Sequence, residues 1–204
     1  MNELMDLCTG DGDATDMPPP SAEVESANDA TTDIAMPLVG RRVTIREFDP
    51  DSDIELLNRW LPDRYGRYFV LSCATAQAVT VEALANSSGN HLGIITLHDG
   101  KPIGAMALLD HSRRQKRAEL RKLIGDPDHR GQGIAEEATR LWLHYAAYGL
   151  GLEKIYVSAL QTQLANIRLN EAIGFKVEGL LRNEVLIDGR RHDVLRMGLC
   201  VPRD

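Results

Sequence analysis

The chain has 204 residues, which suits one domain plus an appended segment and leaves little room for two full cores. Its composition is that of a soluble globular protein, and no apolar run approaches the ~20 residues that a membrane span needs. Nine acidic residues and no lysine or arginine precede Arg41, so the rest of the chain carries +2 of the net −7. That part suits an anionic ligand but is not basic enough to indicate nucleic acid.

Residues 1–37 combine acidic residues with Ser, Thr, Gly and three consecutive prolines at 18–20. Such a segment cannot bury enough apolar area to offset its ordering entropy, so we predict a disordered acidic tail followed by one domain over 38–204. The start of the chain lacks the basic flank and apolar stretch of a secretory signal, which favours a cytoplasmic protein. Cys8, Cys73 and Cys200 lack any paired spacing, so no metal site is predicted.

The first half of the domain reads as strand, two helices and three strands. Residues 42–48 alternate as a strand does, and Asp51 and Ser52 are suited to cap a helix with an apolar face at 54, 57, 60 and 61. A short helix is predicted over 76–86. Strands are predicted over 91–98 and 102–110, joined by Asp99-Gly100, a strong hairpin signal. A polar turn over 111–116 leads to a strand over 117–125.

The second half continues as loop 126–133, helix 134–148, strand 154–160 and helix 163–173. A final hairpin turns at Asp188-Gly189 between strands 177–187 and 192–200. This order predicts an α+β or α/β fold: a mixed, mostly antiparallel sheet of about seven strands flanked by about four helices.

The segment 117–148 carries the strongest chemical signal, because a glycine-rich turn joins its strand to its helix. Gly131 and Gly133 have no Cβ to block an approaching phosphate, and the backbone N–H groups of a helix start attract anions. Taken alone, such a pair before a helix is more often only a tight turn. A dinucleotide fold is disfavoured because Glu136 occupies the third glycine position, and no Gly-Lys-Ser/Thr follows to make a P-loop.

At this point the sequence resembles the GNAT N-acetyltransferases. Residues 130–135, Arg-Gly-Gln-Gly-Ile-Ala, satisfy the family's phosphate-loop signature of Arg/Gln-x-x-Gly-x-Gly/Ala. Residues 38–43 resemble the family's first strand, 124–133 its fourth strand and loop, 166–175 its last helix, and 178–199 its closing hairpin. The combination is most similar to the branch that contains ribosomal-protein N-terminal acetyltransferases and several sugar-amine and polyamine acetyltransferases.

The resemblance implies acetyl-coenzyme A as cosubstrate and a splay between strands 4 and 5 that receives its pantetheine arm. Leu123, Ile124 and Gly125 would offer backbone groups to the arm; ordinary sheet pairing is the alternative for these three. An unpaired strand edge inside a domain needs a partner, which favours the ligand. Further cofactor contacts are predicted for Arg130, Gly131, Gln132, Gly133, Ile134, Ala135, Gln163 and Asn166.

Transfer to an amine needs a neutral nucleophile, a nearby acetyl carbon and stabilisation of the developing oxyanion. Glu119 is the candidate base, by analogy with family members that have a catalytic Glu near the start of this strand. A salt bridge to Arg121 or Arg117 is the alternative role for Glu119. Asn170 occupies the position at which many family members have a Tyr that protonates the thiolate. Asn cannot supply a titratable proton, although it can hydrogen-bond the sulfur or a water.

The predicted activity is therefore acetyl transfer to a primary amine, on a protein N-terminus or a small molecule, by direct attack on the thioester. A second hypothesis changes the acceptor to an amino sugar or another small amine. A third is a module that senses acyl-coenzyme A without turnover, motivated by Asn170. No nucleic-acid or membrane partner is expected, and the chain is expected to be a monomer or homodimer.

Overall fold

The computed structural model describes residues 34–63, 65, 66, 69, 80–160 and 163–201. Contacts group residues 31–204 into one compact unit, and every described residue belongs to it. The tail predicted over 1–37 lies outside the described residues up to 33, as do Cys8 and Cys73. Ile34 and Met36, at the end of the predicted tail, pack against the hydrophobic core.

The described residues form a mixed, mostly antiparallel sheet of eight strands in the order β1-β2-β3-β4-β5-β6-β8-β7. Leu38–Val39 forms a two-residue strand of its own, which is why the sheet has one strand more than predicted. The strands are β1 Leu38–Val39, β2 Val43–Glu47, β3 His91–Leu97, β4 Pro102–Ser112, β5 Arg117–Ile124, β6 Lys154–Leu160, β7 Lys176–Ile187 and β8 Arg190–Cys200.

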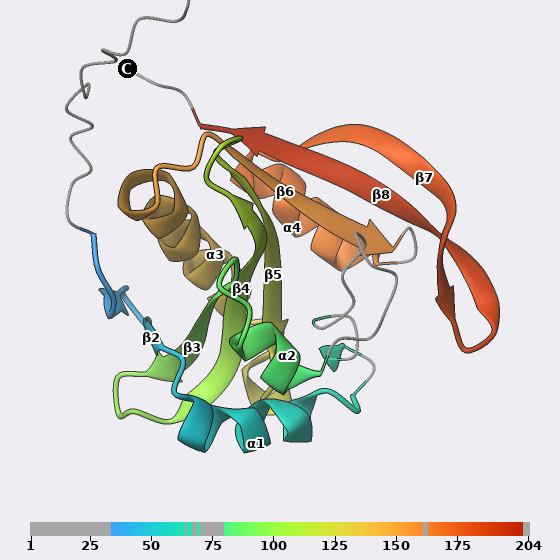
Figure 1. Ribbon diagram of the computed structural model, residues 1–204. Coiled ribbons are helices and arrows are strands. Elements are labelled where there is room, and N and C mark those ends of the chain that lie inside the picture. Colours follow the sequence, from blue (N-terminus) through green and yellow to red (C-terminus); the bar gives the residue numbers. More distant parts are fainter. Residues whose placement is uncertain (1–33, 64, 67–68, 70–79, 161–162, 202–204) are drawn as a thin grey trace, which may run out of the picture. The chain divides into compact units, whose positions relative to one another are not determined.

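The sheet opens between β5 and β6. β5 pairs with β4 antiparallel as far as Ile124, but its parallel pairing with β6 covers only Arg117 to Glu119. β6 continues to Leu160 while paired to β8 on its other side. The edges of β5 and β6 that face each other are therefore unpaired beyond Glu119 and Tyr156, in agreement with the predicted splay (Figure 1).

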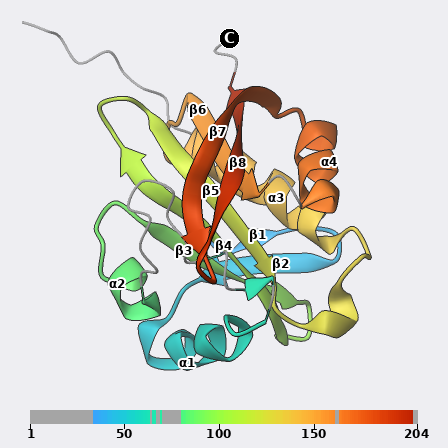
Figure 2. The same cartoon turned by 90° about the vertical axis from the view of Figure 1, so that its right-hand side faces the viewer.

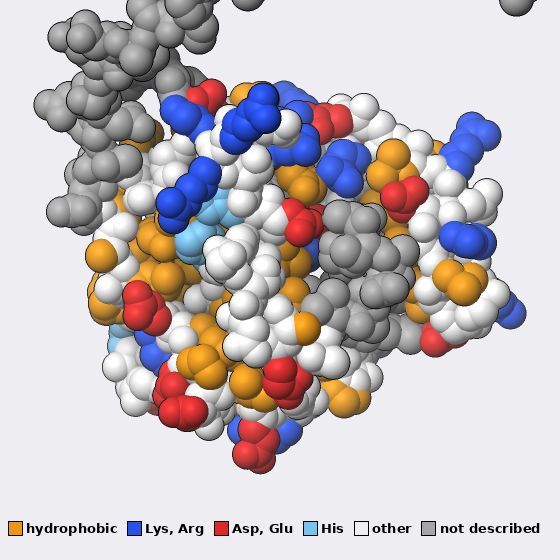
Figure 3. Space-filling model, viewed as in Figure 1, with side chains coloured by type: hydrophobic (Ala, Val, Ile, Leu, Met, Phe, Trp, Pro, Cys, Tyr) orange, Lys and Arg blue, Asp and Glu red, His pale blue; other side chains and the backbone are white. Residues whose placement is uncertain are grey.

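Two pairs of helices cover opposite faces of the sheet (Figures 1 and 2). α1 Pro50–Trp60 and α2 Val81–Ala85 pack on one face through a cluster that includes Leu57, Leu84 and Leu123. Acidic side chains gather over this part of the surface in Figure 3, where α1 and α2 contribute Asp51, Glu55 and Glu82. The helix predicted over 76–86 is described only from residue 80 onward, where α2 follows its Thr80 cap.

α3 Ile134–His144 and α4 Leu164–Ile173 cover the other face. Trp142 of α3 is fully buried in that core, and a π-helical turn over Tyr145–Gly149 extends the helix to the predicted end. α4 ends at Gly174, whose φ of 117° needs a residue without a side chain. The closing hairpin of β7 and β8 turns at Asp188 and Gly189, as predicted.

Candidate active site

β5 presents a different chemistry to each face of the sheet, because side chains alternate along a strand. Leu120 and Ile124 pack into the core under α3 and α4, and Lys122 lies between them on the same face. Leu123 packs into the core under α1 and α2, and Glu119 and Arg121 share its face. The opened strand thus carries a carboxylate on one side and an amine on the other.

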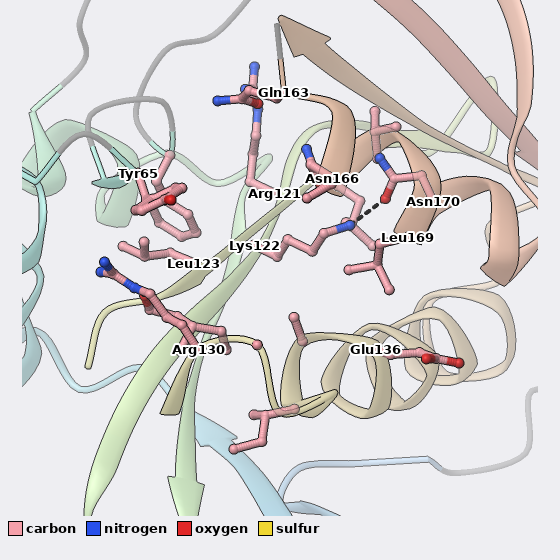
Figure 4. Close-up of a pocket in the computed structure, with 18 of the residues that line it drawn as sticks. Tyr65, Arg121, Lys122, Leu123, Arg130, Glu136, Gln163, Asn166, Leu169 and Asn170 are labelled. Carbon is pink, nitrogen blue, oxygen red and sulfur yellow. Dashed lines mark hydrogen bonds between the residues drawn. The ribbon is translucent and has the colours of Figure 1, made fainter. Parts of the chain in front are cut away.

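A cavity of about 890 Å³ lies along the opening and continues to the amino end of α3. Its volume is in the range of small-molecule sites, roughly 300–1,000 Å³. β5 lines it from Leu120 to Ile124, β6 contributes Val157 and Ser158, and α4 contributes residues on its first two turns (Figure 4). An opening between two parallel strands is thereby continuous with a helix start.

The turn before α3 has the backbone that close approach of an anion requires. Gly131 and Gly133 both have left-handed φ, 73° and 76°, which glycine adopts without steric cost. No side chain caps the amino end of α3, so its first N–H groups lack the usual partner. A Cβ at Gly131 would have no atom within 4 Å, which leaves open space above the turn.

Arg130 folds back against the strand instead of pointing over the turn. Its Nε and Nη2 donate to the carbonyl oxygens of Ile124 and Gly125 at 2.9 and 3.0 Å, and Nη2 lies 2.5 Å from a carboxylate oxygen of Asp63. The ring of Tyr65 lies 4.8 Å from its guanidinium carbon. These contacts fix the loop to the end of β5, so Arg130 acts on the shape of the site.

Gln132 and Gly125 support the loop without lining the cavity. The Gln132 side chain donates to the Asp128 carbonyl oxygen at 2.6 Å, and the backbone carbonyl of Gln132 accepts from the Arg42 side chain at 2.7 Å. A side chain at Gly125 would collide with the Trp60 ring. Both positions therefore tolerate little change even though neither faces the cavity.

Lys122 reaches from β5 to α4 across the cavity. Its Nζ donates a hydrogen bond to Oδ1 of Asn170, which is fully buried (Figure 4). The described residues place no carboxylate within ion-pair distance of Nζ. Burial lowers the pKa of the Lys122 ammonium from its ordinary value to about 7. Lys122 is not among the residues predicted from the sequence, although its place between the core positions Leu120 and Ile124 of a strand marks it as unusual.

Glu119 lies on the opposite face of β5, just where the pairing with β6 ends. Its carboxylate is 1% exposed, does not line the cavity, and forms an ion pair with Arg121 at 2.9 Å. Burial, together with the Glu119 carboxylate, raises the pKa of the neighbouring Tyr156 hydroxyl. The salt bridge that the sequence left open as an alternative is thus present.

Two buried polar atoms on the β6 and α4 walls of the cavity have no hydrogen-bond partner among the described residues. They are Oγ of Ser158 on β6 and Nδ2 of Asn170 on α4, while Oδ1 of Asn170 is occupied by Lys122. Unsatisfied buried polar atoms are costly, and a polar ligand between the strands would satisfy them. Together with the glycine turn, they fit a molecule with an amide-bearing arm and a phosphate group.

The structure gathers most of the predicted site residues into this one cavity. Asn170 lines it, as do these predicted cofactor contacts: Leu123, Ile124, Arg130, Gly131, Gly133, Ile134, Ala135, Gln163 and Asn166. Gly125, Gln132 and Glu119 lie beside it. The cavity is also lined by residues that were not predicted: Leu120, Lys122, Val157, Ser158 and Leu169. The sequence of one strand does not show which neighbouring strand it will separate from, or which helix will cover the opening.

A mixed sheet split between two parallel strands, with a glycine turn leading into the adjacent helix, defines an acyltransferase of the acyl-coenzyme A-binding type. The chain belongs to the GNAT acetyltransferase family: the family model described as "Acetyltransferase (GNAT) domain" matches residues 42–176. Among the described residues, no helix is long and apolar enough to span a membrane, and no group of His, Cys, Asp or Glu has metal-binding geometry.

Curated relatives agree with this assignment, and a solved structure shares the fold. A probable N-acetyltransferase, YjcK, of Bacillus subtilis is 32% identical over 123 residues, covering 60% of this chain and 68% of that protein. Spermidine N(1)-acetyltransferase of Escherichia coli K12 is 31% identical over 99 residues, 48% of this chain and only 53% of the relative. The structure of Vibrio cholerae spermidine N-acetyltransferase with CoA and spermine superposes with a TM-score of 0.68 at 23% identity, covering 78% and 95% of the two chains, which shows the shared fold.

Proposed function

We propose that this protein transfers an acetyl group from acetyl-coenzyme A to a primary amine by direct attack on the thioester. The observation that carries the proposal is the continuity of the β5–β6 opening with the glycine turn of α3. A long thioester with a pantetheine arm and a pyrophosphate needs both parts at once. A simple tight turn would not need the strands to separate.

The residues of the cavity divide between the two ends of such a ligand. Leu123 and Ile124 line the opening, and the unpaired edge of β5 there would pair with the amides of the pantetheine arm, with Gln163 and Asn166 of the α4 start beside them. The turn at 131–135 would hold the pyrophosphate through backbone N–H groups and the helix dipole. Arg130 would keep the turn in place through its bonds to β5.

The coenzyme supplies the activated acetyl group. The protein would orient the thioester and the amine, polarise the acetyl carbonyl and accept the proton of the amine. A backbone N–H of the opened strand near Leu123 would polarise the acetyl carbonyl. Glu119 would accept the proton of the attacking amine through water, because its carboxylate is buried beside Arg121 and not within the cavity. Proton transfer of this kind typically contributes ~10²–10⁴-fold.

For the acceptor we infer a small-molecule primary amine in preference to a protein N-terminus. The support is that a relative more than 30% identical to this chain is named a spermidine acetyltransferase. The alignment covers 53% of that relative. Because the relative is named for spermidine, polyamines are the first acceptors to test. Amino sugars and ribosomal-protein N-termini follow as the other predicted acceptors.

Release of the coenzyme A thiol, measured with a panel of polyamines, amino sugars and N-terminal peptides, tests the proposal. Mass spectrometry of the products should show one added acetyl group on a primary amine. Tight binding of acetyl-coenzyme A without turnover on any acceptor would support the sensing module instead. Absence of coenzyme A binding would reject both.

A further inference from the structure

We propose that Lys122 is the general acid that protonates the departing coenzyme A thiolate, with Asn170 as its positioning residue. The inference rests on the proposed transfer reaction and deepens it. Lys122 lines the cavity on the α3 and α4 face of β5, within the stretch that has separated from β6. The ligand's path between the strands therefore passes its amine.

The reaction creates a need for a proton at the sulfur. The lone pair of the acceptor nitrogen forms the new N–C bond while the C–S bond breaks and its electron pair moves to sulfur. A proton moves from Nζ of Lys122 to that sulfur, which leaves a thiol and a neutral lysine. The surplus proton on the acetylated nitrogen leaves through water or Glu119, and Lys122 regains a proton from solvent before the next turnover.

The other acidic or basic side chains at the cavity are held elsewhere. Arg130 is bonded to strand carbonyls and Asp63, and a guanidinium does not release its proton in proteins. Glu136 of α3 forms an ion pair with Arg140. The remaining charged or titratable lining groups are His129, which lies 3.1 Å from Asp126, Arg121, which pairs with Glu119, and Tyr65, whose ring lies 4.8 Å from the guanidinium carbon of Arg130.

The groups that face Lys122 from α4 and β6 do not titrate. They are Asn166 and Asn170 on α4 and Ser158 on β6. The hydrogen bond to Asn170 aims Nζ across the cavity, and Nδ2 of the same amide stays available to a ligand atom. An ammonium with a pKa near 7 is a stronger acid than an ordinary thiol, whose pKa is about 8.5, so the transfer runs toward the thiol.

Lys122→Met and Lys122→Arg test the role, with Lys176→Met, at an exposed position at the start of β7, as the matched control. With an acceptor that the wild type uses, kcat should fall above about pH 7 as Lys122 loses its proton. In Lys122→Met, kcat should no longer fall above pH 7, and at pH 7 it should be about 10- to 100-fold lower than in the wild type. This loss is near the low end for acid catalysis because a thiolate leaves readily even without a proton. Lys122→Arg should be equally slow, since it keeps the charge but cannot give up a proton.

A second readout does not depend on turnover. The thiolate absorbance of bound coenzyme A, titrated against pH, should give a thiol pKa at least about one unit lower in Lys122→Arg than in Lys122→Met, because the arginine keeps its charge beside the sulfur over the whole titration. The control variant should match the wild type in both measurements.

Three results would overturn the assignment. They are an unchanged pH profile and rate in Lys122→Met, the same thiol pKa in Lys122→Arg as in Lys122→Met, or stoichiometric acetylation of Lys122 by acetyl-coenzyme A, which would make the lysine an acceptor. An active wild type with any of these results rejects the role of Lys122 alone. A wild type that binds coenzyme A but acetylates no amine rejects the proposed function, and the acid role with it.

Discussion

Nζ of Lys122 donates a hydrogen bond to Oδ1 of Asn170, and this contact joins the opened strand β5 to helix α4 across the cavity. The two residues are 48 positions apart in the sequence. Among the described residues, no carboxylate forms an ion pair with Lys122. The amide oxygen of Asn170 can accept a hydrogen bond from the ammonium form and, more weakly, from the neutral amine. The pair therefore keeps its geometry while the lysine changes protonation state.

Asn170→Asp should raise the pKa of Lys122 by one unit or more, because an opposite charge in contact favours the ammonium. The falling limb of the activity profile should move to higher pH by the same amount. NMR of the labelled lysine amine, with and without coenzyme A, measures the shift directly. Asn170→Leu, of similar size and uncharged, is the control and should not raise the pKa.

Stability should depend on pH through Lys122. Its pKa in the folded state, about 7, lies below the value near 10.4 of an unfolded chain, so the unfolded state binds more protons between these two values. Unfolding free energy should therefore rise with pH over this window, by roughly 2 to 3 kcal/mol from pH 6 to pH 9. Lys122→Met should lack this rise. Urea unfolding of both proteins at the two pH values tests it, and parallel pH dependence in the two would contradict the burial of the amine.

Gly133→Asp should weaken coenzyme A binding at least about tenfold, since it places a carboxylate where the turn would receive phosphate. Gly189→Asp is a matched control: its φ of 74° is nearly the 76° of Gly133, but it lies in the β7–β8 turn. Both substitutions introduce a similar backbone strain, but only Gly133→Asp changes the proposed phosphate site. Calorimetric titration with coenzyme A decides; equal affinity in both would place the phosphates elsewhere.

Arg130→Ala should lower coenzyme A affinity by loosening the turn, because it removes the hydrogen bonds to the carbonyls of Ile124 and Gly125 and the ion pair to Asp63. Asp63→Ala should have a smaller effect, and the double variant should be little worse than Arg130→Ala alone. Binding measured across this cycle separates loop support from direct phosphate contact. Fully additive losses would show that Arg130 contributes independently of Asp63.

Gly104→Ala should destabilise the protein by about 1 to 3 kcal/mol, because its Cβ would collide with the carbonyl oxygen of Leu123 on β5. Gly179→Ala, also in a strand but with no atom within 4 Å of its Cβ, should change stability little. Thermal unfolding compares the two. A similar melting temperature for both would mean that β4 and β5 can separate at this point without cost.

The amino-acid sequence by itself determined the order of the elements, the hairpin turns and the glycine turn before α3. These are local properties: strand and helix periodicity, Asp-Gly turns, and residues without a Cβ all act on their near neighbours. It also placed Gly131, Gly133 and Asn170 at the site through their resemblance to family motifs.

Only the tertiary structure decided what Glu119, Lys122 and Arg130 contact. Glu119 turned out to be buried beside Arg121, Arg130 to be bonded to the strand it follows, and Lys122 to face Asn170. Each outcome depends on which face of β5 meets which helix, and on where β6 leaves its neighbour. Such long-range pairings and the desolvation that they impose are properties of the packed molecule, so no local pattern in the chain encodes them.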